Sequence, residues 1–219
     1  MYNEDTEELW EDFEVYVQKL KMIILKKHNK EPLTESDQFS KKEYSECLEM
    51  VYNMSFEHSD ITIISKRLQE IFSDFIRQNI FRTLQKVQSN KELLLDELIK
   101  SWETYELLKK WISRFFHSYN KMTEVHHKKK IHSDTLAIEE FKKIVFIQFR
   151  FHIENSLMLL IEEIRGGEDV KLIAYKSNLR KVFGIFRDLF IEGTQDRTKI
   201  FFELKTKILE MTESYLNHK

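Results

Sequence analysis

The sequence predicts an all-α protein made of long amphipathic helices that are joined by short links. Its 219 residues include only 4 Gly and 1 Pro, the two residue types that most often interrupt helices. Apolar side chains recur at steps of three and four residues along nearly the whole chain, as they do on one face of a helix. No segment alternates apolar and polar residues in the manner of a half-buried strand.

Five helices are expected before residue 125. Their expected boundaries are 7–28, 40–56, 60–80, 93–105 and 107–122. Pro32 follows the first helix and ends it, because proline lacks an amide donor and clashes with the preceding turn. Asp60 is a candidate cap for the third helix, and Ser89 with Asn90 offers a capping signal before the fourth.

Three further helices are expected after an exposed loop at 125–130, where the apolar pattern stops. Their expected boundaries are 133–165, a helix that reaches about residue 191, and 196–216. Gly166 and Gly167 stop the first of them, because glycine permits left-handed backbone angles. No sequence repeat of 20 to 50 residues is visible.

Composition excludes several classes of protein. A formal net charge of −2 argues against a dedicated nucleic-acid binder, which needs a basic surface. The single cysteine, Cys47, excludes an internal disulfide framework and is typical of a reducing compartment. Residues 1–8 are acidic and lack a signal-peptide apolar run, and charged residues interrupt the most apolar stretch, 141–164. We therefore expect a cytoplasmic or nuclear protein that does not span a membrane.

Enzyme chemistry is not predicted. The sequence has no glycine-rich phosphate loop and no nucleophile motif, so we expect no catalytic residues and no cofactor. His126, His127 and His132 are the nearest approach to a metal cluster, but they lie beside three lysines with no cysteine nearby. A solvated basic loop is the favoured interpretation over a metal site.

Three stretches of the sequence, 39–54, 94–121 and 141–186, carry a resemblance to a known family. The second stretch contains the strings L-I-K-S-W and W-I-S-R-F-F-H, and all three follow one another in the family's order. Together they resemble the N-terminal region of the cullins, the scaffolds of multisubunit ubiquitin ligases. Among cullins the similarity is greatest to those that recruit F-box proteins.

The resemblance implies an elongated stack of five-helix cullin repeats. Residues 1–125 would form one complete, adaptor-binding repeat, and residues 126–219 would form part of a second, with an insertion of roughly one turn near 170–174. It also implies a non-catalytic scaffold module that binds a Skp-type BTB-fold adaptor and its F-box receptor. No segment resembles the region that recruits a RING subunit, so that subunit is not expected to bind here. A chain that ended naturally at Lys219 would act as a competitor, and an unrelated helical rod, such as a vesicle-tethering subunit, is the alternative.

The family's adaptor-facing positions fall on the second and fifth expected helices. The residues that match them here are Tyr44, Ser45, Leu48, Tyr52, Arg114, Phe115 and Ser118. Helical spacing agrees with this assignment on the second helix, since 44, 48 and 52 share one face while Cys47, Val51 and Met54 share another. The inward residues of the fifth helix would be Ile112, Phe116 and Tyr119. Ser45 and Ser118 depart from the family, which commonly has a bulky apolar residue and an aromatic residue at these two places.

Overall fold

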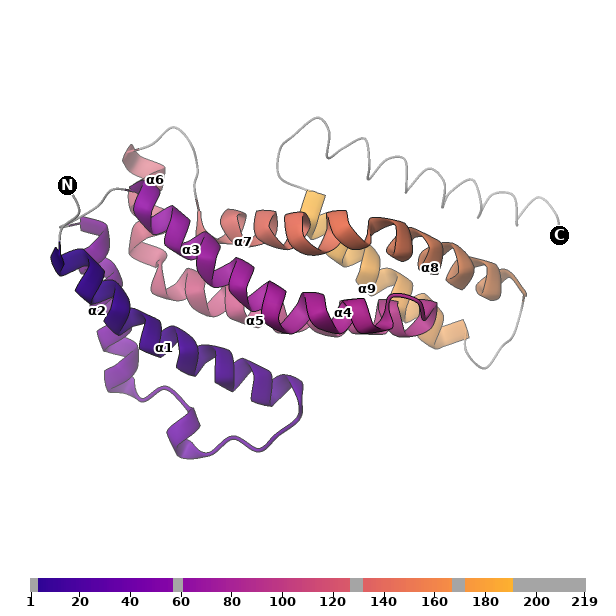
Figure 1. Ribbon diagram of the computed structural model, residues 1–219, viewed down its shortest axis with the longest axis horizontal. Coiled ribbons are helices and arrows are strands. Elements are labelled where there is room, and N and C mark those ends of the chain that lie inside the picture. The colour runs from indigo at the N-terminus through magenta and orange to yellow at the C-terminus, as the bar shows by residue number, and fades with distance from the viewer. Residues whose placement is uncertain (1–3, 57–60, 127–131, 167–171, 191–219) are drawn as a thin grey trace. The chain divides into compact units, whose positions relative to one another are not determined.

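The computed structural model describes residues 4–56, 61–126, 132–166 and 172–190, and every regular element in these ranges is helical (Figure 1). The elements are α1 (Glu4–His28), the 3-10 turn η1 (Glu35–Asp37), α2 (Lys41–Phe56), α3 (Ile61–Phe75), the π-helical segment η2 (Ile76–Phe81), α4 (Arg82–Val87), α5 (Lys91–Phe115), α6 (His117–His126), α7 (Ser133–Phe141), the π-helical segment η3 (Lys142–Phe146), α8 (Ile147–Gly166) and α9 (Leu172–Phe190). The all-α prediction is therefore confirmed for the described part of the chain.

One expected helix boundary is wrong. The sequence pattern predicts a break between residues 105 and 107, but α5 runs without interruption from Lys91 to Phe115. Glu106 and Lys109 form an ion pair three residues apart at the expected break, and no glycine or proline is present there to end the helix. The break comes instead at Phe116, after which α6 begins at His117.

Two of the long expected helices contain a π-helical segment that the periodicity does not predict. The stretch expected at 60–80 continues as α3, η2 and α4, and the stretch expected at 133–165 continues as α7, η3 and α8. A π segment adds a residue to a turn, so it rotates the helix face that follows. The helix expected at 196–216 and most of the loop expected at 125–130 lie outside the described residues.

The chain separates into two compact units. The first comprises residues 1–78 and 103–141, and the second comprises residues 79–102 and 142–219. Because the division passes through α5, it does not test the expected boundary between residues 125 and 126, which stays a prediction.

Aromatic side chains form the core of the first unit, in which α1 packs on α2, α2 on α6, and α3 on α7 (Figure 1). Phe13 of α1 is fully buried and meets Phe115 and Phe116 edge to face, with ring centroids 6.0 and 5.4 Å apart. Farther along α5, the buried Tyr105 lies 5.1 Å from Phe141 and donates a 2.7 Å hydrogen bond to the carbonyl oxygen of Ala137. The two contacts of Tyr105 attach α7 to α5.

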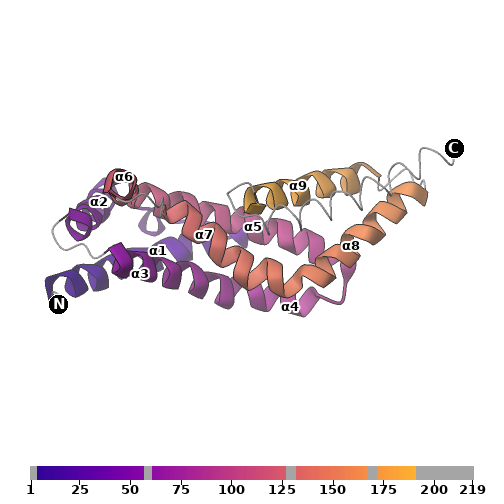
Figure 2. The ribbon, with the colours of Figure 1, turned by 90° about the horizontal axis from the view of Figure 1, so that it is seen from above.

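Among the described residues of the second unit, α8 packs on α9 and aromatic side chains again meet in the core (Figure 2). Phe81 lies 5.2 Å from Phe149, and Phe146 of η3 meets Phe186 of α9 edge to face at 5.3 Å. The side-chain amide of Asn178 donates a 2.6 Å hydrogen bond to the Asp96 carboxylate, which links α9 to the start of α5.

One described stretch, Ser133–Glu163, is long and apolar enough to cross a membrane by length and composition alone. Half of its most apolar window is buried against the rest of the protein, as is usual for a core helix. Lys142, Lys143 and Arg150 also lie within the stretch. This feature is therefore weak evidence for a membrane span.

Candidate functional site

Helix α2 is held at its first turn by an N-terminal cap and by two contacts with α1. The Ser40 and Glu43 side chains and backbone amides form a reciprocal capping box, with hydrogen bonds of 2.7 and 3.2 Å. Lys19 of α1 donates a 2.6 Å hydrogen bond to Glu43, and Tyr16 donates one of 2.7 Å to Glu46. The Lys19 and Ser40 hydrogen bonds lower the pKa of Glu43 to about 2, and the Glu46 contact raises the pKa of Tyr16 to about 12.

One face of α2 is buried. Cys47, Val51 and Met54 are fully covered, in agreement with the core face predicted from their spacing. Burial raises the pKa of the Cys47 thiol to about 12, so this cysteine is an inert core residue. The neighbouring face of α2, about 90° around the helix, carries Tyr44, Leu48 and Tyr52.

The wall that faces α2 comes from the end of α5 and the start of α6. Ile112, Phe116 and Tyr119 are fully buried, as the sequence predicts. The Tyr119 hydroxyl lies 2.8 Å from the Ser65 hydroxyl of α3, which fixes α6. These buried residues leave the intervening positions of the two helices on the surface.

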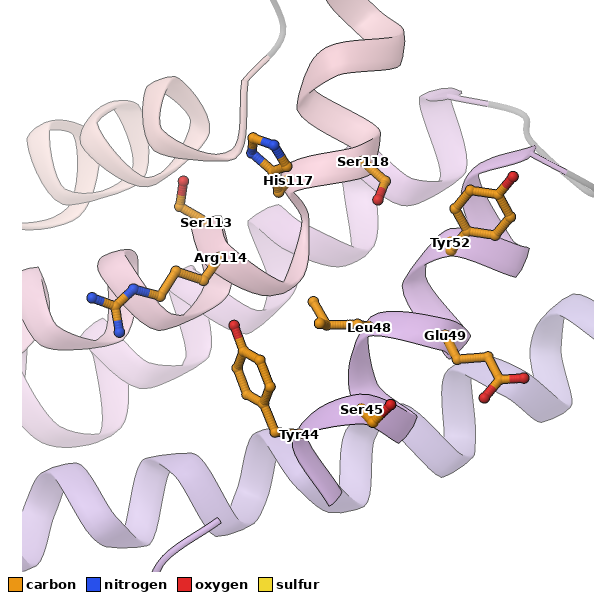
Figure 3. Close-up of a pocket in the computed structure, with 9 residues that line it drawn as sticks. All are labelled: Tyr44, Ser45, Leu48, Glu49, Tyr52, Ser113, Arg114, His117 and Ser118. Atoms are coloured by element: carbon orange, nitrogen blue, oxygen red, sulfur yellow. The ribbon is translucent and has the colours of Figure 1, made fainter. Parts of the chain in front are cut away.

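An open groove of about 770 Å³ lies between α2 and the α5–α6 junction. Its lining residues are Tyr44, Ser45, Leu48, Glu49, Tyr52, Ser113, Arg114, His117 and Ser118. Figure 3 shows Leu48 near the middle, with Tyr44 and Tyr52 on either side of it along α2 and Ser118 projecting from the facing wall. The structure therefore brings together six of the seven residues that the sequence analysis selects.

Phe115 is the exception, and the prediction that it faces the surface is wrong. Its side chain is 1% exposed and packs against Phe13, Phe39 and Tyr44. The physical reason is its place on the buried face of α5, since Phe115 lies three residues after Ile112 and seven after Leu108, both fully buried. Phe115 instead lies in the core and packs against Tyr44, which lines the groove.

Three groove residues are absent from the sequence-based set. Ser113 and His117 lie on either side of the helix break, so helical spacing gives no signal that joins them. Glu49 lies four residues after Ser45 on α2, and that spacing is the signal that could have found it.

The two tyrosines of the groove differ in their surroundings. The Tyr44 ring is half-buried, with centroids 5.7 Å from Phe115 and 6.3 Å from Trp111. The Arg114 guanidinium lies over the other aromatic neighbour, Trp111, at 5.6 Å. Tyr52 is 51% exposed. Tyr44 is therefore fixed by packing, whereas Tyr52 offers most of its ring to solvent.

Metal ligation is not supported in the part of the chain that the structure describes. No group of three or more His, Cys, Asp or Glu side chains there could hold a metal ion. His132 lies 3.3 Å from Glu124, and His127 lies outside the described residues. The geometry thus defines an all-helical protein with an open, tyrosine-lined groove between α2 and the α5–α6 junction.

Comparison with known proteins shows which family the chain belongs to. The cullin α-solenoid domain matches residues 10–219. Cullin-1 of Oryza sativa subsp. japonica is 25% identical over 191 residues, which cover 86% of this chain and 23% of that protein. Putative cullin-like protein 2 of Arabidopsis thaliana is 24% identical over 184 residues, which cover 80% of this chain and 46% of that protein.

The chain belongs to the cullin family, because the family domain matches nearly its whole length. The resemblance found in the sequence is confirmed, and the alternative of an unrelated helical rod is wrong. The chain spans less than half the length of the two relatives.

Proposed function

We propose that this chain is the adaptor-binding scaffold module of a cullin-RING ubiquitin ligase of the SCF type. In this proposal the groove binds a Skp-type adaptor, which carries an F-box receptor, in the cytoplasm or nucleus. One observation carries the proposal: the residues at the family's adaptor-facing positions and the residues that line the groove are nearly the same set. Family resemblance and surface geometry select that set independently.

The groove has the physical properties of a protein-binding surface. Tyrosine, leucine and arginine meet there, and tyrosine and arginine are enriched among the residues that dominate binding energy. Tyr44 is already immobilised against Trp111 and Phe115, so a partner would not have to order its ring. Tyr52 would bury a large apolar ring while its hydroxyl stays at the wet rim.

The proposal assigns no chemistry to this segment. Ubiquitin transfer would depend on a RING subunit, and we expect no RING subunit to bind here. The module would instead fix the position of a receptor relative to the rest of a ligase.

The test compares two truncations of similar exposed apolar side chains. Tyr52 is 51% exposed in the groove, and Met22 is 56% exposed on α1, outside it. We expect Tyr52→Ala to weaken calorimetric binding of a Skp-type adaptor by about 2 kcal/mol, or roughly 30-fold in Kd. Met22→Ala should bind like the unmodified chain. Tyr44 is unsuitable for the first test, because its truncation would also remove packing from Phe115.

A second variant tests the groove without removing apolar surface from it. Ser118→Glu would place a carboxylate in the groove without touching the core, and it should also weaken adaptor binding because the partner would cover an unpaired charge. Unchanged affinity in both Tyr52→Ala and Ser118→Glu would exclude the groove as the site. Absence of binding by the unmodified chain would exclude a Skp-type adaptor as its partner.

A further inference from the structure

The α5–α6 wall of the groove carries a row of exposed basic residues. Arg114 and His117 line the groove itself. Lys110 lies one turn before Arg114 on the same face of α5, and Lys121 lies one turn after His117 on the same face of α6. All four are exposed, and we call them the cationic stripe after the two lysines and the arginine.

The cationic stripe is uncompensated within the part of the chain that the structure describes. Several other cations of the first unit have carboxylate partners, such as Lys19 with Glu43 and Lys26 with Asp37. None of the four stripe residues forms an ion pair with a described residue. The stripe is therefore a local concentration of positive charge in a chain whose formal net charge is −2.

No ion pair joins the nearby described carboxylates to the stripe. Asp134 accepts a 3.2 Å hydrogen bond from Ser113 and keeps its charge, Glu106 pairs with Lys109, and Glu124 lies 3.3 Å from His132. Glu49 is exposed, but it belongs to the α2 wall on the other side of the groove. The groove thus has one wall that is cationic and another that combines apolar side chains with a carboxylate.

We infer that the cationic stripe receives an acidic segment of the protein whose apolar residues occupy the groove beside Leu48 and Tyr52. This inference rests on the proposed function and adds the chemistry of the partner to it. A protein surface can present carboxylates to one wall and apolar groups to the other. A nucleic-acid backbone fits less well, because Leu48 offers it no pairing and Glu49 repels it.

Charges at the rim of an interface act chiefly on association rate and salt dependence. The two lysines lie outside the groove lining, so their removal leaves the apolar contacts intact. We therefore expect the stripe to accelerate binding strongly at low ionic strength and weakly once salt screens it.

The experiment measures adaptor association by surface plasmon resonance between about 50 and about 500 mM NaCl. Lys110→Gln with Lys121→Gln should lower the association rate about 5-fold at the lowest salt and less than about 2-fold at the highest. The matched control is Lys27→Gln with Lys66→Gln, which removes two exposed lysines from α1 and α3 and should leave the rate unchanged. Equal salt dependence in the stripe variant and the control would overturn the inference while leaving the proposed function intact.

A second arm works even if the adaptor does not bind. A fluorescent poly-glutamate peptide at low salt should bind the unmodified chain and the control, and bind the stripe variant at least about 5-fold more weakly. A single-stranded oligonucleotide of the same charge is the comparison. If the oligonucleotide bound more tightly than the peptide, and the stripe variant lost that binding, the partner of the stripe would be a nucleic acid and not an acidic protein. Equal binding of the peptide to the stripe variant and the control would also overturn the inference.

Discussion

At the scale of single residues, Lys30 is held in an unfavourable backbone conformation at the end of α1. Its φ is 58°, in the left-handed region that favours glycine. The amides of Lys30 and Glu31 donate to the carbonyls of Lys27 and Lys26, at 3.1 and 2.9 Å, which is the hydrogen-bond pattern of a Schellman cap. The helix end therefore requires this conformation even though the residue does not suit it.

We predict that Lys30→Gly stabilises the protein. The gain should be about 1 kcal/mol, because glycine removes the left-handed strain and loses only part of that gain to its greater freedom when unfolded. Urea unfolding monitored by circular dichroism measures the change. Lys30→Ala is the control, since it removes the same side chain without relieving the strain. Equal stability of the two variants would show that loss of charge, not backbone conformation, was responsible.

Asn120 connects α6 to the start of α7 through two buried hydrogen bonds. Its side-chain nitrogen donates a 3.0 Å hydrogen bond to the Ser133 hydroxyl, and its side-chain oxygen accepts a 2.9 Å hydrogen bond from the Ser133 backbone amide. We predict that Asn120→Ala lowers the free energy of unfolding by about 2 kcal/mol, because it leaves a buried amide unpaired. A double-mutant cycle with Ser133→Ala isolates the hydrogen bond to the Ser133 hydroxyl, since alanine keeps the backbone amide. Additive effects in that cycle would mean that the hydroxyl bond contributes nothing beyond the two side chains separately.

The residues of the groove were partly predictable from the sequence. Periodicity separated the inner and outer faces of α2 correctly, since a helix without interruption keeps its spacing. The family resemblance, not periodicity, placed Phe115 among the adaptor-facing residues, and that assignment failed because Phe115 shares the buried face of α5 with Leu108 and Ile112. Spacing along one chain also cannot show which two helices face each other. That part of the prediction came from the family resemblance.

At the scale of secondary-structure elements, α1 and α2 are coupled by a carboxylate that stays ionised well below neutral pH. Hydrogen bonds from Lys19 and Ser40 lower the pKa of Glu43 to about 2 in the folded chain. A lowered folded pKa means that the unfolded chain binds the proton more readily. The stabilising contribution is therefore complete above the unfolded pKa of about 4.3 and is lost as the pH falls toward 2.

We predict that Glu43→Gln flattens the pH dependence of stability. The free energy of unfolding of the unmodified chain should fall more steeply between about pH 5 and pH 2 than that of the variant. Lys19→Gln should flatten it in the same direction, since it removes the hydrogen bond that lowers the pKa of Glu43 most. Urea titrations at stepped pH provide the measurement. Parallel pH profiles for the unmodified chain and Glu43→Gln would contradict the assignment.

Two features of the elements escaped the sequence pattern for a common reason. Apolar periodicity reports which residues are covered, and coverage continues smoothly through residues 103–109 and through both π-helical segments. The missed continuity of α5 and the missed segments η2 and η3 depend on backbone hydrogen bonding instead. Glycine or proline would have marked a break, but neither occurs within these stretches.

At the scale of the whole molecule, the first compact unit does not end where the first expected repeat ends. The unit includes residues up to 141, whereas the expected repeat stops at 125 and would exclude α7. Helix α7 buries Leu136, Ala137 and Phe141 within this unit. It also accepts the Tyr105 hydrogen bond at Ala137. The predicted repeat boundary and the compact unit thus divide these helices differently.

This difference predicts the behaviour of two fragments. Residues 1–141 should unfold cooperatively, whereas residues 1–125 should be less stable by about 5 kcal/mol, the sum expected for two large buried side chains and a buried hydrogen bond. A loss of that size is comparable with the whole stability of many small domains, so the shorter fragment should lack a cooperative thermal transition. Both fragments keep α1 to α5 and nearly all of α6, so the comparison isolates α7. Differential scanning calorimetry of the pair is the measurement. Equal transition temperatures would mean that residues 1–125 form a complete folding unit without α7.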